Sequence, residues 1–253
     1  MKLNLNADLG ESFGAWRMGD DAGLLEVVDS ANVACGFHAG DPRVMSATVA
    51  RAHARGVGVG AHPAFPDLQG FGRREMRLPD DELAAAVQYQ IGALEAFCRV
   101  HGARLAHVKP HGALNNLACE ERAIADVVVA AVHAFSPDLV LLAPALSELA
   151  RAGEARGLTV ALEIFADRAY TARGTLVSRA EPGAVLDSSA AAVAHVRAMI
   201  DAGGLVTADG DVLATPFHSV CVHGDGAHAL ETARALRQGL VADGHELVAL
   251  GTV

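Results

Sequence analysis

Short apolar runs alternate along this chain with longer segments in which apolar residues recur every three or four positions. Runs of the first kind are typical of buried strands, and the longer segments are typical of helices with one packed face. This alternation favours a parallel sheet covered by helices, because each helix returns the chain to the start of the next strand. A chain of 253 residues has about the length that one α/β barrel needs. We therefore predict a single barrel domain over residues 1–253.

Seven strands are predicted, near residues 2–6, 30–35, 58–61, 105–109, 138–142, 159–163 and 219–223. Asp41-Pro42 has the pattern of a helix cap followed by proline in the first turn, and Gly56 is expected to end that helix. Further helices are expected from Pro79 onward and over residues 120–134, 145–156, 188–202 and 228–243. Residues 170–187 are irregular and are interpreted as a lid or binding loop. Residues 204–214 are predicted to form a hairpin.

Charge and composition exclude several classes of protein. The formal net charge is -10 and the basic residues are dispersed, so a nucleic-acid partner is not expected. No apolar run has the length of a signal peptide or a membrane span. The four cysteines lack CxxC spacing, which favours reduced thiols and a cytoplasmic protein. The oligomeric state stays open, a homo-oligomer included.

Common nucleotide and acyl-enzyme motifs are absent from the sequence. There is no Walker-type glycine-lysine-serine/threonine signature and no Gly-x-Ser-x-Gly elbow. Gly56, Gly58 and Gly60 resemble a dinucleotide fingerprint only superficially, because His62 and Pro63 follow where a helix should begin. We expect these glycines to allow close approach of a neighbouring strand.

Polar residues gather where the predicted strands end, which is where α/β barrels assemble their active sites. The catalytic candidates are Asp8, Glu11, His38, His62, Lys109 and His111. The substrate-binding candidates are Asn6, Arg73, Asn116, Asp167, Arg168, His223 and Asp225.

Structural roles are the alternative for several of these candidates. Asp8 and Glu11 could begin a loop or cap a helix, and Lys109 could form a salt bridge inside the barrel. Arg168 could be one half of a surface ion pair. The segment 70–74 is either a substrate loop or a turn with solvated arginines.

Several motifs in order along the chain resemble the LamB/YcsF family. They are NLNADLGE (residues 4–11), SANVACGFHAGD (30–41), GAHP (60–63), PDLQGFGRR (66–74), VKPHGAL (108–114), FADRAY (165–170) with LVSR (176–179), and VHGD (222–225). The resemblance runs nearly from end to end. One departure is Asn115, which stands where the family usually has tyrosine.

The resemblance implies a fold and an activity. The fold is a distorted seven-stranded, TIM-like (β/α)7 barrel, similar to the barrels of polysaccharide deacetylases and glycoside hydrolases. The activity is the ATP-dependent opening of 5-oxoproline to glutamate, carried out together with partner subunits B and C. ATP is then a cofactor, handled together with those partners.

An unstrained lactam needs both an activated carbonyl and an activated water. Phosphorylation of the lactam oxygen by ATP would supply the first. For the second, Asp8 or Glu11 is the expected general base, and His62 or His111 is expected to pass the proton to the leaving nitrogen. Lys109 and Arg168 are expected to bind a carboxylate or phosphate.

Asp167 and Asp225 are expected to orient two other members of the site. Their carboxylates would hold the guanidinium of Arg168 and the imidazole of His223.

Two other functions fit the same residues. One is a metal-dependent, deacetylase-like hydrolase of a carbohydrate or another amide, with a divalent metal held by Asp8, His38, His62 and His223. The other is a non-catalytic subunit for carbohydrate utilisation or regulation.

Overall fold

Seven parallel strands close into a barrel in the computed structural model, which describes residues 1–186, 188–224 and 228–250. The strand order is β1-β2-β3-β4-β5-β6-β9, and β9 pairs with β1 to close the ring. The strands are β1 (Lys2–Leu9), β2 (Ser30–Ala34), β3 (Gly58–His62), β4 (Leu105–Val108), β5 (Val140–Pro144), β6 (Val160–Phe165) and β9 (Ser219–Val222). The barrel and the places of its seven strands confirm the prediction.

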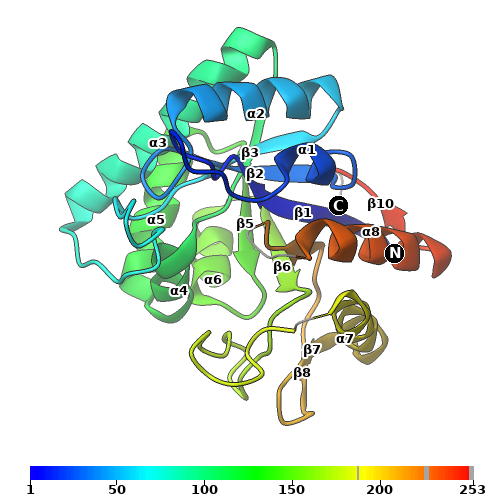
Figure 1. The fold of residues 1–253 in the computed structure, drawn as a ribbon. Helices are drawn as coiled ribbons and strands as arrows, with labels where there is room; N and C mark the ends of the chain where they lie inside the picture. The colour runs from blue at the N-terminus through cyan, green and yellow to red at the C-terminus, as the bar shows by residue number, and fades with distance from the viewer. Residues whose placement is uncertain (187, 225–227, 251–253) are drawn as a thin grey trace.

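Helices surround the strands (Figure 1). They are α1 (Asp21–Leu24), α2 (Pro42–Ala54), α3 (Asp80–His101), α4 (Gly112–Glu120), α5 (Arg122–Phe135), α6 (Glu148–Arg156), α7 (Ser189–Ala202) and α8 (Ala229–Ala242). Asp41 caps α2 as expected, because its carboxylate accepts hydrogen bonds from the backbone N–H groups of Arg43 and Val44. None of the helices in the described ranges is long and apolar enough to cross a membrane.

Two elements differ from the prediction or were missing from it. Residues 112–120 form α4 directly after the polar segment that follows β4, whereas a helix was expected only from residue 120. A short strand, β10 (Glu246–Leu247), pairs in parallel with the first residues of β1.

Strands β7 (Gly204–Val206) and β8 (Val212–Ala214) form the expected hairpin, which lies beside α7 (Figure 1).

The interior of the barrel is polar, although every strand is covered by helices. In β1, Leu3, Leu5 and Leu9 belong to the apolar core, whereas the alternate residues Asn6 and Asp8 bond to side chains of other strands. Side chains of a strand point alternately to its two faces, so the apolar set packs under the helices and the polar set fills the barrel. This polar filling leads up to the rim where the strands end.

Gly60 of β3 makes room for that filling. A Cβ atom at this position would overlap the imidazole of His107 on the neighbouring strand β4. The expected close approach of a strand neighbour is therefore confirmed at Gly60, and it is caused by a buried histidine.

Residues 170–186 fold into an irregular loop, and position 187 of the predicted lid lies outside the described residues. The buried Arg168 donates hydrogen bonds to the carbonyls of Val177 (2.6 Å) and Ala184 (3.2 Å) and so ties two parts of this loop together. The role of a lid stays a prediction.

Candidate active site

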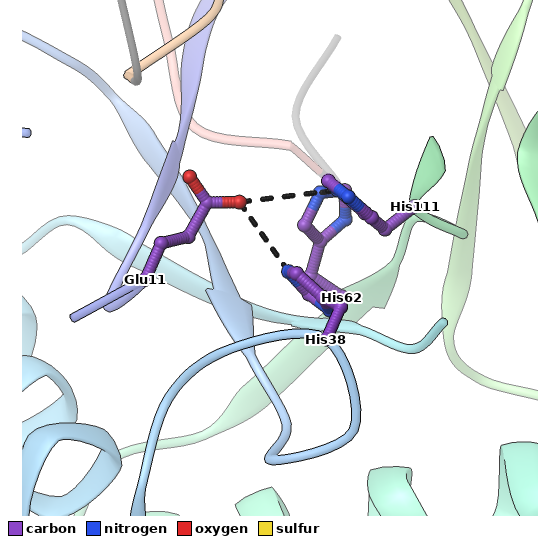
Figure 2. A group of neighbouring side chains, drawn as sticks. All are labelled: Glu11, His38, His62 and His111. Carbon is purple, nitrogen blue, oxygen red and sulfur yellow. Dashed lines mark hydrogen bonds and ion pairs between the residues drawn. The ribbon is translucent and has the colours of Figure 1, made fainter. Parts of the chain in front are cut away.

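Four side chains from different strand ends meet in a buried group, which we call the histidine cluster: Glu11, His38, His62 and His111 (Figure 2). Glu11 follows β1, His38 follows β2, His62 ends β3, and His111 lies between β4 and α4. Each is at most 5% exposed. Residues far apart in the sequence thus share one site, because parallel strands bring their ends to one rim.

The ligand atoms of the cluster all lie within 4.8 Å of one another, so the group could hold a metal ion. Glu11 Oε1 is 3.3 Å from His38 Nε2 and 3.8 Å from His111 Nδ1. The rings of His38 and His111 stack at 3.8 Å between centroids.

Backbone carbonyls fix the tautomers of two members. His62 Nδ1 is 2.6 Å from the carbonyl oxygen of Lys109, and His111 Nε2 is 2.9 Å from that of Phe71. A carbonyl oxygen only accepts, so both of these ring nitrogens must donate. The remaining nitrogens, His62 Nε2 and His111 Nδ1, face each other at 3.0 Å. In the neutral rings each of them presents a lone pair.

The segment 70–74 forms one wall of the cluster. The ring of Phe71 lies edge-on to His38 and His111, and Arg73 lies over its face at 4.9 Å. Gly72 has a φ of 65°, and a Cβ there would come within 2.9 Å of atoms of both histidines. Only glycine fits this conformation and this space without strain.

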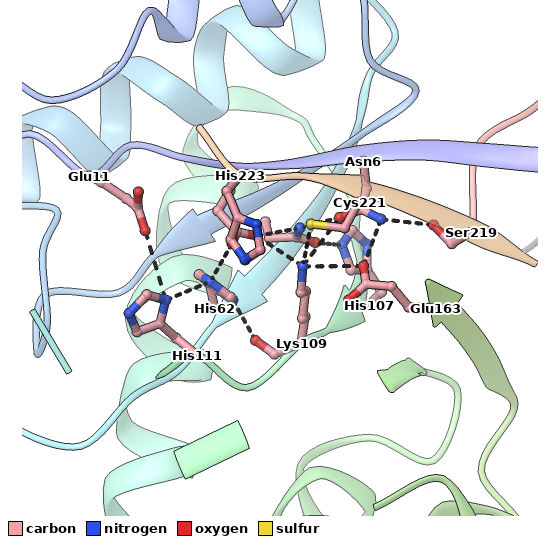
Figure 3. A network of polar contacts seen from close by, with 12 residues as sticks. Asn6, Glu11, His62, His107, Lys109, His111, Glu163, Ser219, Cys221 and His223 are labelled. Carbon is pink, nitrogen blue, oxygen red and sulfur yellow. Dashed lines mark hydrogen bonds and ion pairs between the residues drawn. The ribbon is translucent and has the colours of Figure 1, made fainter. Parts of the chain in front are cut away.

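A second group, the lysine network of Asp8, Lys109, Glu163 and Cys221, lies beside the cluster (Figure 3). Lys109 Nζ donates to Asp8 Oδ1 (3.1 Å) and Cys221 Sγ (3.0 Å) and lies 3.2 Å from Glu163 Oε1. The expected alternative of a salt bridge inside the barrel therefore describes the surroundings of Lys109. Asp8 also joins the two groups, because its Oδ2 lies 3.4 Å from His62 Nε2.

The charge states follow from burial and from these neighbours. Burial opposes ionisation of Asp8, but His62 and Lys109 hold its pKa well below the usual value. Burial also opposes the charge on Lys109, but Asp8, Cys221 and Glu163 hold its pKa well above the usual value. Asp8 and Lys109 are therefore an ion pair at neutral pH.

Two histidines of the cluster, unlike Asp8 and Lys109, are held in their uncharged form. Burial lowers the pKa of His38 and of His111 well below the usual value, and neighbouring histidines add to the effect. Both rings are thus neutral at pH 7 and present lone pairs rather than positive charge.

A deeper layer holds the lysine network in place. Asn6 donates to Glu163 Oε1 (2.8 Å) and to Ser219 Oγ (2.8 Å), and its own oxygen accepts from Asn32 (2.7 Å). His107 contacts the Asn32 oxygen at 2.8 Å. Apart from Asn6, none of these was a sequence candidate. The signal was present in β1, where polar residues alternate with apolar ones in a strand that has no solvent-exposed face.

The substrate-binding candidates are placed as follows. His223 Nδ1 lies 2.9 Å from the Asp167 carboxylate. Burial opposes ionisation of Asp167, but the contact with His223 more than offsets this and lowers the pKa of the carboxyl. Asn6 is fully buried among protein partners, and Asn116 is exposed on α4. Asp225, expected to orient His223 or Arg168, lies outside the described residues.

The ligand group differs from the set expected at the sequence level. His38 and His62 belong to both sets, whereas Glu11 and His111 stand in place of Asp8 and His223. Asp8 is paired with Lys109, and His223 is paired with Asp167.

The fold and site define a (β/α)-barrel protein with buried carboxylate and imidazole groups at one rim. The chain belongs to the LamB/YcsF family, whose sequence model matches residues 3–253. A protein of Azoarcus sp. (strain BH72), named as the A subunit of 5-oxoprolinase, is 61% identical over 99% of this chain and 98% of its own length. A protein of the same name from Methylococcus capsulatus is 54% identical over 98% of this chain and 96% of its own.

Solved structures give the same fold. The lactam utilization protein from Thermus thermophilus superposes with a TM-score of 0.92 at 44% identity, over 99% of this chain and 100% of its own. A peptidoglycan deacetylase from Bacillus subtilis superposes with a TM-score of 0.50 at 12% identity, over 99% of this chain and 88% of its own. The second likeness concerns the fold alone and confirms the predicted deacetylase-like barrel.

Proposed function

We propose that this chain is the A component of a cytoplasmic 5-oxoprolinase, in which it takes part in the ATP-dependent opening of 5-oxoproline to glutamate. The names of its full-length relatives support this assignment, and so does the lactam utilization protein that shares its fold. The observation that carries the chemistry is that Asp8, which is paired with Lys109, also contacts His62, whose Nε2 faces His111 Nδ1.

The proposed reaction needs a water molecule to lose a proton as it attacks the lactam carbonyl. A proton taken up at the gap between His62 Nε2 and His111 Nδ1 is shared by two nitrogens, with the Asp8 carboxylate 3.4 Å from the first. Asp8 itself is a weak base because its pKa is low, so its negative charge serves to stabilise the proton on His62. Glu11, on the other side of His111, is the second carboxylate able to take the proton.

The same proton then passes to the lactam nitrogen as the carbon–nitrogen bond breaks. With the lactam oxygen phosphorylated, this step would leave an acyl phosphate of glutamate, and a second water would then release phosphate and glutamate. A carboxylate substrate needs a cation to bind its negative charge. We assign this role to Arg73, which lies over the Phe71 ring at the wall of the cluster.

The chain carries no P-loop motif. We therefore assign ATP binding to the assembled enzyme, with partner subunits B and C supplying the element that this chain lacks. Activation of the lactam oxygen by phosphorylation would precede the attack of water. A divalent metal is the second cofactor that we propose. If His62 and His111 hold it, their facing nitrogens would not take up the proton, and Asp8 would accept it instead.

The test is reconstitution. The full-length chain is purified with candidate B and C subunits, and 5-oxoproline-dependent release of phosphate and formation of glutamate are measured with each component omitted in turn. We expect both products only when all three chains are present. Unchanged glutamate formation in the absence of this chain would contradict the proposal.

A further inference from the structure

We infer that the histidine cluster is a binding site for one divalent transition-metal ion, held by Glu11, His38, His62 and His111. The inference uses the site of the proposed function but not its reaction. It replaces the ligand set that the sequence suggested, which contained Asp8 and His223.

The gap between His62 and His111 needs a positive charge. Both rings donate from their outer nitrogens to backbone carbonyls, of Lys109 and of Phe71, so their inner nitrogens cannot hydrogen-bond each other while both rings are neutral. These nitrogens nevertheless face each other at 3.0 Å. Two lone pairs at this separation repel unless a positive charge lies near them, and the charge must be either a proton or a metal ion.

The number of acceptors around that point distinguishes the two ions. Glu11 Oε1 lies 3.8 Å from His111 Nδ1 and 3.3 Å from His38 Nε2. Asp8 Oδ2 lies 3.4 Å from His62 Nε2. One proton can bridge two of these atoms, whereas a dication binds several donors at once. The arrangement of the Glu11 carboxylate and three imidazoles, with the charge of Asp8 beside them, therefore favours the dication.

The surroundings also hold the ligands in place. A metal-bound histidine usually donates its other N–H group to a carbonyl or carboxylate, which fixes the ring. His62 and His111 both do so. The Phe71 ring and Gly72 close one side of the cluster, which limits its exchange with water.

The donor set restricts the kind of ion. Mg²⁺ and Ca²⁺ prefer oxygen ligands, whereas three imidazoles and a carboxylate suit Zn²⁺, Co²⁺ or a related ion. Such an ion lowers the pKa of a bound water and polarises a carbonyl. Asp8, held outside the ligand set by Lys109, then lies within reach to accept a proton.

The test uses the full-length chain without partner subunits. The protein is stripped with dipicolinate and titrated with CoCl₂, and the visible d–d spectrum is recorded; ZnCl₂ binding is measured in parallel by equilibrium dialysis and elemental analysis. We expect one equivalent of each ion and a Co²⁺ spectrum that differs from that of the aqueous ion. Binding that does not saturate, with the spectrum of aqueous Co²⁺, would overturn the inference in favour of a shared proton.

Two variants locate the ion. Glu11→Gln and His111→Gln should each weaken binding at least about tenfold, whereas His53→Gln, on the exposed face of α2, should not. Circular dichroism establishes that each variant is folded. If a variant is not folded, the Co²⁺ spectrum of the wild-type protein decides whether the ion binds. Equal affinity in His111→Gln and His53→Gln would also overturn the inference. Because no partner or substrate is present, failure here leaves the proposed 5-oxoprolinase reaction untouched, and failure of reconstitution leaves the metal site untouched.

Discussion

His62 Nε2 and His111 Nδ1 face each other at 3.0 Å while the opposite nitrogen of each ring is bound to a backbone carbonyl. This pair joins the histidine cluster to the lysine network. Glu11 lies on one side of it, and on the other side Asp8 connects the pair to the buried Lys109. The chemistry that we propose depends on this sequence of contacts from carboxylate to imidazole pair, carboxylate and ammonium.

Lys109→Met should destabilise the protein by about 3–5 kcal/mol, because it leaves Asp8 and Glu163 buried without a cation. Chemical denaturation at pH 7 measures the effect. The double variant Lys109→Met/Glu163→Gln should recover part of the loss, since one of the two uncompensated carboxylates is then removed.

The control for Lys109→Met is Arg99→Met. The Arg99 side chain is 79% exposed in an ion pair with Glu95 one helical turn away, so its loss should change the unfolding free energy little. If the two variants had equal stability, the lysine network would have no role in holding the barrel together.

Gly60→Ala should cost about 1–3 kcal/mol, because the new methyl group overlaps the His107 ring. The overlap disappears in a His107→Ala background. We therefore expect the Gly60 substitution to be much less harmful there, with a coupling energy of about 1 kcal/mol or more in a double-mutant cycle. Additive effects would mean that the two residues do not touch.

His107 should also make the protein sensitive to acid. Burial lowers its pKa from 6.5 to about 3, so the folded state keeps this ring neutral while the unfolded chain takes up a proton below pH 6.5. The unfolded state then binds more protons, and stability falls as the pH drops from 6.5 toward 3. His107→Gln keeps a donor for Asn32 but does not titrate.

Between pH 7 and pH 5 the wild type should therefore lose about 2 kcal/mol more than the His107→Gln variant. Urea denaturation at both pH values gives the difference, and the other histidines cancel because both proteins contain them. If both proteins lost the same free energy of unfolding between the two pH values, His107 would take up its proton in the folded state as readily as in the unfolded chain.

The architecture was predictable because apolar runs, helix caps and turn residues act locally. Asp41-Pro42 and the hairpin of β7 and β8 are found where the sequence places them. Helix α4 was missed because it begins at Gly112, inside the polar stretch after β4 that indicates a loop. The two residues of β10 carry too little pattern to be recognised, since their place depends on the distant strand β1.

The site was predictable only as a collection of rim residues. The sequence placed Asp8, His62 and Lys109 at strand ends, but not which of their atoms meet. Register across neighbouring strands decides that Asp8 binds Lys109, and the turn at Gly72 brings the Phe71 carbonyl to His111. Glu163 and Cys221 were not among the site candidates, because their importance comes from a lysine on another strand.

The most direct test of the account is oxoproline-dependent phosphate release by the reconstituted complex with Asp8→Asn or His62→Ala in this chain. Asp8→Asn should fold, since Glu163 still balances Lys109. Asp126→Asn and His53→Ala, both at exposed positions, are the matched controls. We predict a loss of about 100-fold or more in each site variant and near wild-type rates in both controls. Full activity in Asp8→Asn and His62→Ala would contradict the account.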